Sequence, residues 1–140
     1  MSDLKSIQRL LVVQALYETT INKYEDDYSI DQIFKNIIVN SDFKKKLKNS
    51  NLTFALEIYR GVSLNLKNID KVLSESIDKK IKKRSLDNLF ISIFRTAIFE
   101  LKFHRDISKS IVISEYLMIT KRFFGDKECS LLNGVLDNLR

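Results

Sequence analysis

LTFALEIYRGVSLNLKNIDKVL, residues 52–73, carries the clearest periodic pattern of the sequence. Its apolar residues recur at alternating intervals of three and four, which places them on one stripe along an α-helix. The members of the stripe are Leu52, Ala55, Tyr59, Val62, Leu66, Ile69 and Leu73, and Ile77 extends it. The pattern predicts one long helix, or two helices broken near residues 68–70.

The same periodicity continues toward the C-terminus. Residues 86–101 carry a wide apolar face behind two candidate caps, Ser85 and Asp87, which is typical of the central helix of a bundle. Two more helices are expected at about residues 109–124 and along a final stripe over residues 131–139. Gly125 stands where a left-handed C-terminal cap would end the first of these two helices.

Toward the N-terminus, the pattern predicts a helix from Leu4 to about Ile21, with Asp3 as its cap. A shorter helix is expected after Ser29, because Ser29 and Gln32 have the spacing of a capping box. Phe43 and Leu47 indicate one more helical stretch between two polar interruptions.

Composition also favours an all-α fold. The chain has 140 residues, no proline and three glycines, whereas an all-β domain normally uses more of both. We predict a compact bundle of six or seven helices that forms a single domain over residues 1–140. No apolar run is long enough to span a membrane, and a lone cysteine suits a reducing compartment, so the expected location is cytoplasmic.

The residues that usually carry catalysis are few. His104 and Cys129 are the only histidine and the only cysteine, too few for the ligand set of a typical zinc site. We expect His104 to be a solvated loop residue and Cys129 to behave as a small apolar group. The three glycines are isolated, so none belongs to a phosphate-binding loop. The sequence predicts a protein that is not an enzyme and uses no cofactor or metal.

The net charge of +6 is compatible with an anionic partner. Two lysine-rich runs, residues 44–48 and 79–84, are each better explained as solvated helix ends, where lysine complements the helix dipole. Lys5, Arg9 and Tyr17 lie on related faces of the first helix and form a candidate RNA-facing patch. A cation can bind phosphate and a tyrosine ring can stack on an unpaired base, although tyrosine is more often a core residue.

Three stretches of the sequence resemble motifs of the NusB family. Residues 9–17, RLLVVQALY, are similar to the family's opening helix, and residues 94–101, FRTAIFEL, to its Leu-Arg-x-Ala-x-Tyr-Glu-Leu segment. The third stretch comprises Ile113-Ser114-Glu115, Lys121-Arg122-Phe123 and Asn133-Gly134-Val135-Leu136-Asp137. Because these motifs occur in the family's order and at nearly its separations, the chain is identified as a member of this family.

The resemblance implies a helical fold of two packed subdomains and a role in transcription antitermination. It implies binding to the single-stranded boxA element of ribosomal RNA leaders together with the ribosomal protein NusE. The complex then acts with RNA polymerase to suppress premature termination. On matching motif positions, the resemblance makes Arg9 and Tyr17 RNA-contacting candidates.

Other motif positions leave two interpretations open. Arg95, Glu100 and Asn133 match family positions that contact NusE or RNA, or that serve the structure. For the two charged residues the structural alternative is a buried Arg–carboxylate pair that links helices. For Asn133 and Gly134 it is packing, because glycine inside a helix permits close approach of another backbone.

The chain departs from the family pattern in its basic residues. Members usually open with several adjacent arginines, and here only Lys5 and Arg9 stand in that region. The lysine–aromatic pair that precedes Asn-Gly in the family is replaced by Ser-Leu-Leu at residues 130–132.

These departures predict an RNA surface that is weaker than usual, or shifted toward Lys121 and Arg122 or toward residues 79–84. The alternative is a helical protein–protein adaptor without an RNA role. The sequence leaves monomer and homodimer both open.

Overall fold

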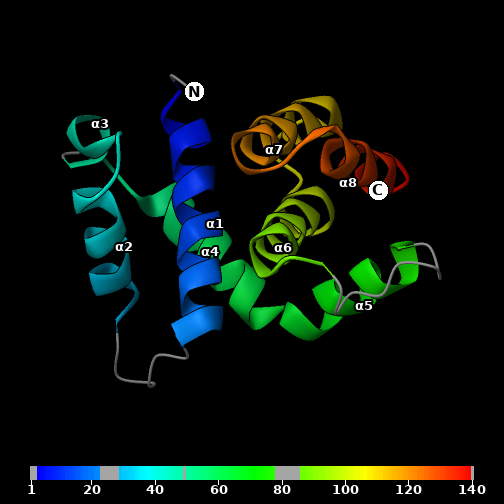
Figure 1. Ribbon diagram of the computed structural model, residues 1–140. Helices are drawn as coiled ribbons and strands as arrows, with labels where there is room; N and C mark the ends of the chain where they lie inside the picture. The colour runs from blue at the N-terminus through cyan, green and yellow to red at the C-terminus, as the bar shows by residue number, and fades with distance from the viewer. Residues whose placement is uncertain (1–2, 23–28, 49, 78–85, 140) are drawn as a thin grey trace.

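The computed structural model describes residues 3–22, 29–48, 50–77 and 86–139, and within these ranges the chain forms eight α-helices and no strand (Figure 1). The helices are α1 (Leu4–Asn22), α2 (Ile30–Val39), α3 (Lys44–Lys48), α4 (Thr53–Leu64), α5 (Leu66–Ser76), α6 (Asn88–Lys102), α7 (Lys109–Phe123) and α8 (Asp126–Asp137). The all-α prediction is confirmed, with one helix more than the six or seven expected.

The stretch 52–73 forms two helices, one of the two alternatives predicted for it, but the break lies at Asn65 and not near residues 68–70. The Asn65 backbone N–H bonds to the carbonyls of Gly61 and Val62, and its side-chain Nδ2 donates to the Gly61 carbonyl at 2.8 Å. The asparagine therefore satisfies carbonyl groups that the end of α4 would otherwise leave unpaired. The apolar spacing continues unchanged across this break, so periodicity alone could not locate it.

Two of the predicted helix starts are confirmed by their caps. The Ser29 hydroxyl accepts a hydrogen bond from the Gln32 N–H at 3.2 Å, and an Asp87 carboxylate oxygen accepts from the Leu89 N–H at 2.8 Å. The prediction of a left-handed cap at Gly125 is wrong. Gly125 has a φ of −101° and precedes α8, whereas α7 ends at the extended residue Phe124.

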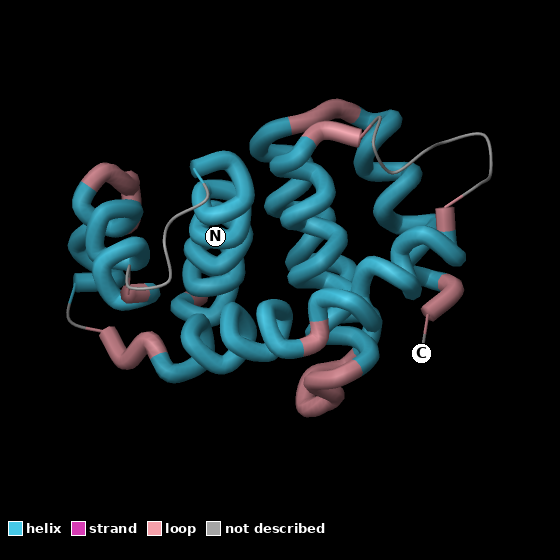
Figure 2. The backbone as a smooth tube through the Cα atoms, turned by 90° about the horizontal axis from the view of Figure 1, so that it is seen from below, coloured by secondary structure: helices cyan, strands magenta, loops and turns pink. Residues whose placement is uncertain are grey.

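The helices pack around two centres. In the N-terminal half α2 and α4 pack against α1, and in the C-terminal half α5, α7 and α8 pack against α6. The two groups meet where α1 contacts α6, and Figures 1 and 2 show them side by side. This arrangement confirms the two packed subdomains that the family resemblance implied. Ala97 and Ile98 of α6 have no exposed surface, as expected for a central helix.

Two helical glycines differ in what surrounds them. A Cβ atom added at Gly61 of α4 would overlap the Phe99 ring of α6, whereas a Cβ added at Gly134 of α8 would meet no atom within 4 Å. Close packing therefore requires glycine at position 61. The packing interpretation of Gly134 is not borne out within the chain.

We expect opposite effects of alanine at these two positions. Gly61→Ala should lower the free energy of unfolding by about 1–3 kcal/mol, the usual cost of overpacking a core. Gly134→Ala should raise it by up to about 1 kcal/mol, because alanine favours a helix interior over glycine. Urea denaturation of both variants measures the two changes, and a neutral Gly61→Ala variant would contradict the close approach of Phe99.

Candidate nucleic-acid interface

Arg9, a predicted RNA contact, lies in the interior between α1 and α6. Its side chain is 2% exposed, and Glu100 facing it is fully buried. The Arg9 Nε donates to Glu100 Oε1 at 2.9 Å, and Nη2 donates to Glu100 Oε2 at 3.1 Å. A two-point pairing of this kind fixes the orientation of both side chains. Arg9 therefore cannot be the surface phosphate contact that the sequence predicted.

Residues of α7 complete a buried polar network around this pair. The Tyr116 hydroxyl donates to Glu100 Oε1 at 3.1 Å, and Glu115 Oε1 lies 3.8 Å from Arg9 Nη1. The other Glu115 oxygen accepts a hydrogen bond of 2.7 Å from the Ser6 hydroxyl of α1. The network thus ties the start of α1 to α6 and α7. Of the two interpretations of Glu100, the structure supports the buried pair.

The network shifts the pKa values of two of its members. Burial alone would lower the pKa of Arg9, but the hydrogen bond to Glu100 and the charge of that carboxylate outweigh it and leave the pKa raised. Burial, with the nearby Glu100 charge, raises the pKa of the Tyr116 hydroxyl well above its usual value of 10.0. Tyr116 therefore stays protonated in the folded chain at pH values where an unfolded tyrosine ionises.

This shift predicts a loss of stability in alkali. Above a pH of about 10 the unfolded chain releases the Tyr116 proton and the folded chain keeps it, so the free energy of unfolding falls by about 1.4 kcal/mol per pH unit from this group. The loss continues until the pH reaches the raised pKa of the folded state. The Tyr116→Phe variant has no such hydroxyl, so its free energy of unfolding does not fall for this reason. The difference in free energy of unfolding between the parent and this variant should therefore become smaller between pH 10 and 11.

Denaturant titrations at pH 8, 10 and 11 measure this effect. Tyr17→Phe is the matched control because it removes a hydroxyl from a tyrosine that is 37% exposed. If both variants change the pH dependence of the free energy of unfolding equally, the loss of stability in alkali does not come from the buried Tyr116 hydroxyl.

Lys5 and Tyr17 are both exposed, but they do not form one patch with Arg9. Twelve residues of helix separate them, which corresponds to about 18 Å along α1 and about 120° around its axis. The Lys5 ammonium lies 5.3 Å from the centre of the Phe54 ring, and the Arg9 guanidinium lies 5.1 Å from the same ring. Lys5 and Arg9, in the first two turns of α1, therefore both pack on α4. Tyr17 lies farther along α1 and on another side of the helix.

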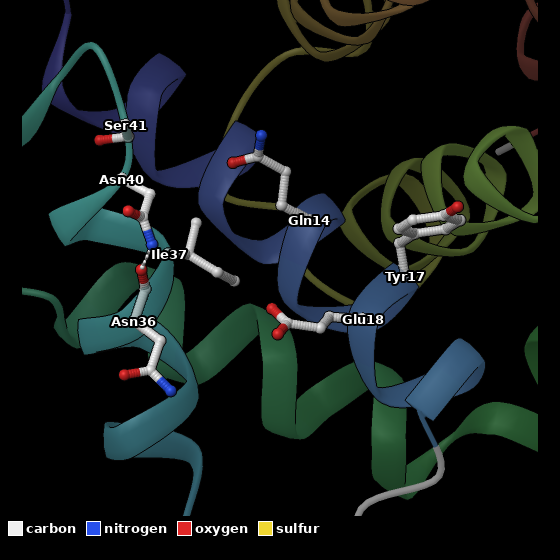
Figure 3. Close-up of a pocket in the computed structure, with 7 residues that line it drawn as sticks. All are labelled: Gln14, Tyr17, Glu18, Asn36, Ile37, Asn40 and Ser41. Carbon is white, nitrogen blue, oxygen red and sulfur yellow. Dashed lines mark hydrogen bonds between the residues drawn. The ribbon is translucent and has the colours of Figure 1, made fainter.

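Tyr17 borders a pocket of about 390 Å³ between α1 and α2 (Figure 3). All but one of the residues that line it carry a polar group, and they are Gln14, Tyr17, Glu18, Asn36, Ile37, Asn40 and Ser41. Amide, hydroxyl and carboxylate groups of the pocket supply hydrogen-bond donors and acceptors, whereas the exposed Tyr17 ring stands at its border and points away from α2 (Figure 3). Hydrogen-bonding groups and exposed aromatic rings are the features that read unpaired bases in single-stranded RNA. The sequence predicted Tyr17 but gave no sign of the α2 residues that line the pocket.

Lys121 and Arg122 are exposed in the last turn of α7. The Arg122 guanidinium lies 5.5 Å from the centre of the Phe43 ring, just before α3. The structure therefore brings the end of α7 to the residue before the lysine-rich helix α3, a contact between residues about eighty positions apart in the sequence. The other basic candidate, residues 79–84, lies outside the described residues.

Arg95 and Asn133 have different surroundings. Arg95 Nε and Nη2 donate to the two carboxylate oxygens of Asp70 at 2.9 and 3.0 Å, which links α6 to α5 in a partly exposed pair. This arrangement supports the structural interpretation of Arg95. Asn133 is exposed on α8.

His104 and Cys129 also have defined positions. The His104 side chain is only 17% exposed, its ring lies near those of Phe54 and Phe99, and its Nε2 lies 3.3 Å from a Glu57 oxygen. The expectation of a solvated histidine is therefore wrong, because aromatic rings from α4 and α6 cover it. Cys129 is half-buried on α8.

Metal-binding and membrane-spanning features are both absent from the described residues. No group of three or more histidine, cysteine, aspartate or glutamate side chains there is arranged to hold a metal ion. None of the helices in that part of the chain is long and apolar enough to cross a membrane.

The family model of the NusB family matches residues 6–140 of the chain. The chain belongs to the NusB family. Among its relatives is the transcription antitermination protein NusB of Geotalea daltonii, 29% identical over 94% of this chain and 90% of that protein. The transcription antitermination protein NusB of Clostridium novyi is 28% identical over 94% of this chain and 93% of its own length.

Solved structures of NusB proteins share the fold. NusB of T. maritima is 28% identical and superposes with a TM-score of 0.73 over 98% of this chain and 90% of that one. A chain from a crystal structure of the antitermination factors NusB and NusE in complex with double-stranded RNA gives a TM-score of 0.77 at 17% identity, covering 98% of this chain and 96% of that one. The latter likeness concerns the fold alone.

Several NusB motif positions in this chain are explained by packing. Arg9, Glu100 and Glu115 come from three separate motif stretches, and all three belong to the one buried network. Sequence reasoning missed its other members, Ser6 and Tyr116. It had one usable signal, since Tyr116 directly follows the motif residue Glu115 and lies on the apolar face of its helix.

Proposed function

We propose that this chain is a transcription antitermination factor that binds boxA-type single-stranded RNA of ribosomal RNA leaders together with NusE. In this role it acts as a non-enzymatic adaptor in the cytoplasm and helps RNA polymerase to suppress premature termination. The match of the NusB family model to residues 6–140 carries the proposal. The shared fold and the relatives named as antitermination proteins support it.

For the RNA contacts we propose Tyr17 with the adjoining α1–α2 pocket, together with Lys5, Lys121 and Arg122. All four side chains are exposed, and three carry a positive charge that a phosphate group can approach. Arg9 and Glu100 would act indirectly, by holding α1 against α6 and α7. Asn133, exposed on α8, is proposed as a contact for NusE or RNA. The whole of residues 1–140 would function as one domain.

A gel-shift titration tests this function. We expect the isolated chain to bind a boxA oligonucleotide weakly, because the cluster of arginines usual at the family's N-terminus is reduced. Adding the cognate NusE should tighten the complex by supplying further RNA contacts. Affinity should also fall as salt rises, since phosphate contacts release counterions. An affinity for boxA that NusE leaves unchanged would contradict cooperation between the two proteins.

The Tyr17→Ala variant serves to locate the RNA surface in the same titration. If Tyr17 stacks on a base, its truncation should cost about 1–3 kcal/mol of binding free energy. The melting temperature should change little, because the ring is partly exposed. A chain that binds NusE but no RNA at all would favour the protein–protein adaptor.

A further inference from the structure

We propose that the lysines of α3 and the basic residues around the end of α7 form one surface that binds the phosphate backbone of single-stranded RNA. This surface, the α3–α7 basic surface, comprises Lys44, Lys45, Lys46, Lys48, Lys121 and Arg122. The proposal rests on the proposed RNA-binding function and adds the α3 lysines to Lys121 and Arg122. Neither the family motifs nor the lysine run considered alone points to RNA binding by α3.

Helix α3 carries a high density of positive charge. Its sequence is KKKLK, in which Leu47 is buried and all four lysines are exposed. Lys44 and Lys48 are four residues apart, where like charges on a helix destabilise it. The helix dipole favours Lys45, Lys46 and Lys48, which stand in the last turn, but not Lys44 in the first position. Repulsion among four like charges on five residues offsets part of what the dipole contributes, so the fold holds a concentrated positive charge at little gain in stability.

A second basic segment comes close to the start of this helix. The contact between the Arg122 guanidinium and the Phe43 ring fixes the end of α7 next to the residue that precedes Lys44. In Figure 1, α3 and α7 lie on either side of the N-terminal part of α1. Residues 42–48 and 121–127 together hold seven basic and two acidic residues, a net charge of +5 in a chain whose total is +6. The two segments thus form one of two concentrations of positive charge in the sequence, the other being residues 79–84.

The surface continues into the α1–α2 pocket. Ser41 lines that pocket, and its hydroxyl accepts a hydrogen bond of 3.2 Å from the Phe43 N–H. Polar groups in the pocket suit bases, the exposed Tyr17 ring stands at its border, and the lysines beyond Phe43 suit phosphates. An acidic protein would use the lysines but would have no need of an adjoining base-sized pocket. The juxtaposition of the two therefore favours a single-stranded nucleic acid over an acidic protein.

The test compares two triple variants that remove the same charge. Lys44→Gln/Lys45→Gln/Lys46→Gln removes three charges of α3 and keeps Leu47, and glutamine matches lysine in helix propensity. Arg60→Gln/Lys67→Gln/Lys71→Gln removes three exposed charges from α4 and α5. Affinity for a boxA oligonucleotide in the presence of NusE is measured for both variants and the parent between about 0.05 and 0.5 M salt, values of the order at which phosphate contacts are sensitive.

We expect the α3 variant to bind RNA about 10- to 100-fold more weakly than the parent at about 0.1 M salt. The slope of log affinity against log salt should flatten by about 0.7 for each phosphate group that the variant no longer binds. An oligonucleotide of unrelated sequence should lose affinity by a similar factor, because phosphate contacts carry no base specificity. The α4–α5 variant should stay within about threefold of the parent, since it loses only long-range attraction, which salt screens.

The outcomes separate this proposal from the function on which it rests. If the parent fails to bind boxA RNA with NusE, the proposed function fails. If the parent binds and the two triple variants behave alike, the function stands and the α3–α7 basic surface is overturned. If the α3 variant loses affinity for NusE without RNA and keeps its RNA salt dependence, the surface binds protein, which also overturns the proposal. A single variant, Lys45→Gln, repeats the measurement with a smaller change in case the triple variant does not fold.

Discussion

Replacing Glu100 with glutamine is expected to lower the free energy of unfolding by about 3–5 kcal/mol, the cost of removing one partner from a buried ion pair. Glu100 Oε1 accepts hydrogen bonds from Arg9 Nε and from the Tyr116 hydroxyl, and Oε2 accepts from Arg9 Nη2. Either orientation of a glutamine amide sets its NH2 group against a donor. The variant also leaves the Arg9 charge buried, with only Glu115 at 3.8 Å to offset it.

The pair between Arg95 and Asp70 is the matched control. It has the same two-point geometry, at 2.9 and 3.0 Å, but its side chains are 17% and 25% exposed. Because solvent screens this pair, Asp70→Asn should cost about 1 kcal/mol or less. Urea denaturation of the two variants gives the comparison. If Glu100→Gln and Asp70→Asn lose the same free energy of unfolding, burial of the ion pair does not determine its contribution to stability. That result would contradict the stabilising role of the buried network.

The Glu100 variant also tests whether the network supports RNA binding. Ser6, Arg9 and Glu100 hold the start of α1 beside α7, so loosening them should disturb the position of Lys5 relative to Lys121. If the network serves folding alone, Glu100→Gln should bind boxA RNA and NusE as the parent does at temperatures where both are folded.

Most helices could be predicted because their apolar spacing is local information. The stretch 52–73 was recognised as helical from spacing alone, but the break at Asn65 could not be located. There Val62 and Ile69 keep the register of the stripe on both sides of the break, while Leu66 between them is 37% exposed. The break depends on the Asn65 backbone and side-chain hydrogen bonds to the end of α4, which the hydrophobic pattern does not record.

The site was harder to predict because burial of a charged residue depends on its partner. Arg9 looked like a surface cation, and its partner Glu100 is ninety-one residues away. One local signal was available. Residues 10–13, LLVV, are apolar around the whole turn that follows Arg9, and a helix that is apolar on all sides belongs in an interior. An arginine on such a helix is expected to pair with a carboxylate.

The α3 lysines were visible in the sequence, but their neighbours in space were not. They stand in one run of the sequence, and a run alone is best explained as a solvated helix end. Their relation to Arg122 and to the α1–α2 pocket arises only when the helices pack. Sequence motifs therefore do not predict a surface formed by segments that are distant in the chain, even where the fold is predicted correctly.

Replacing Phe94 with alanine should also cost about 3–5 kcal/mol, the range for truncating a fully packed phenylalanine. The Phe94 side chain has no exposed surface, and its ring lies 4.7 Å from that of Phe90, which in turn lies 5.3 Å from Phe124. Truncation removes the ring that joins α6 to the core and leaves a cavity that these neighbours fill only in part. The measurement is urea denaturation with a circular dichroism readout.

Phe103 at the end of α6 is the matched control for this change. Its ring stacks on Phe99 at 6.0 Å but is 43% exposed, so Phe103→Ala should cost about 1 kcal/mol or less, as is usual near the surface. Both variants should keep a helical spectrum in the absence of urea. Because Phe94 is buried in the C-terminal half, a loss that appears as one cooperative transition would mean that the two halves unfold together. A near-neutral Phe94→Ala variant would place this face of α6 outside the core and contradict the packing described for the whole central helix.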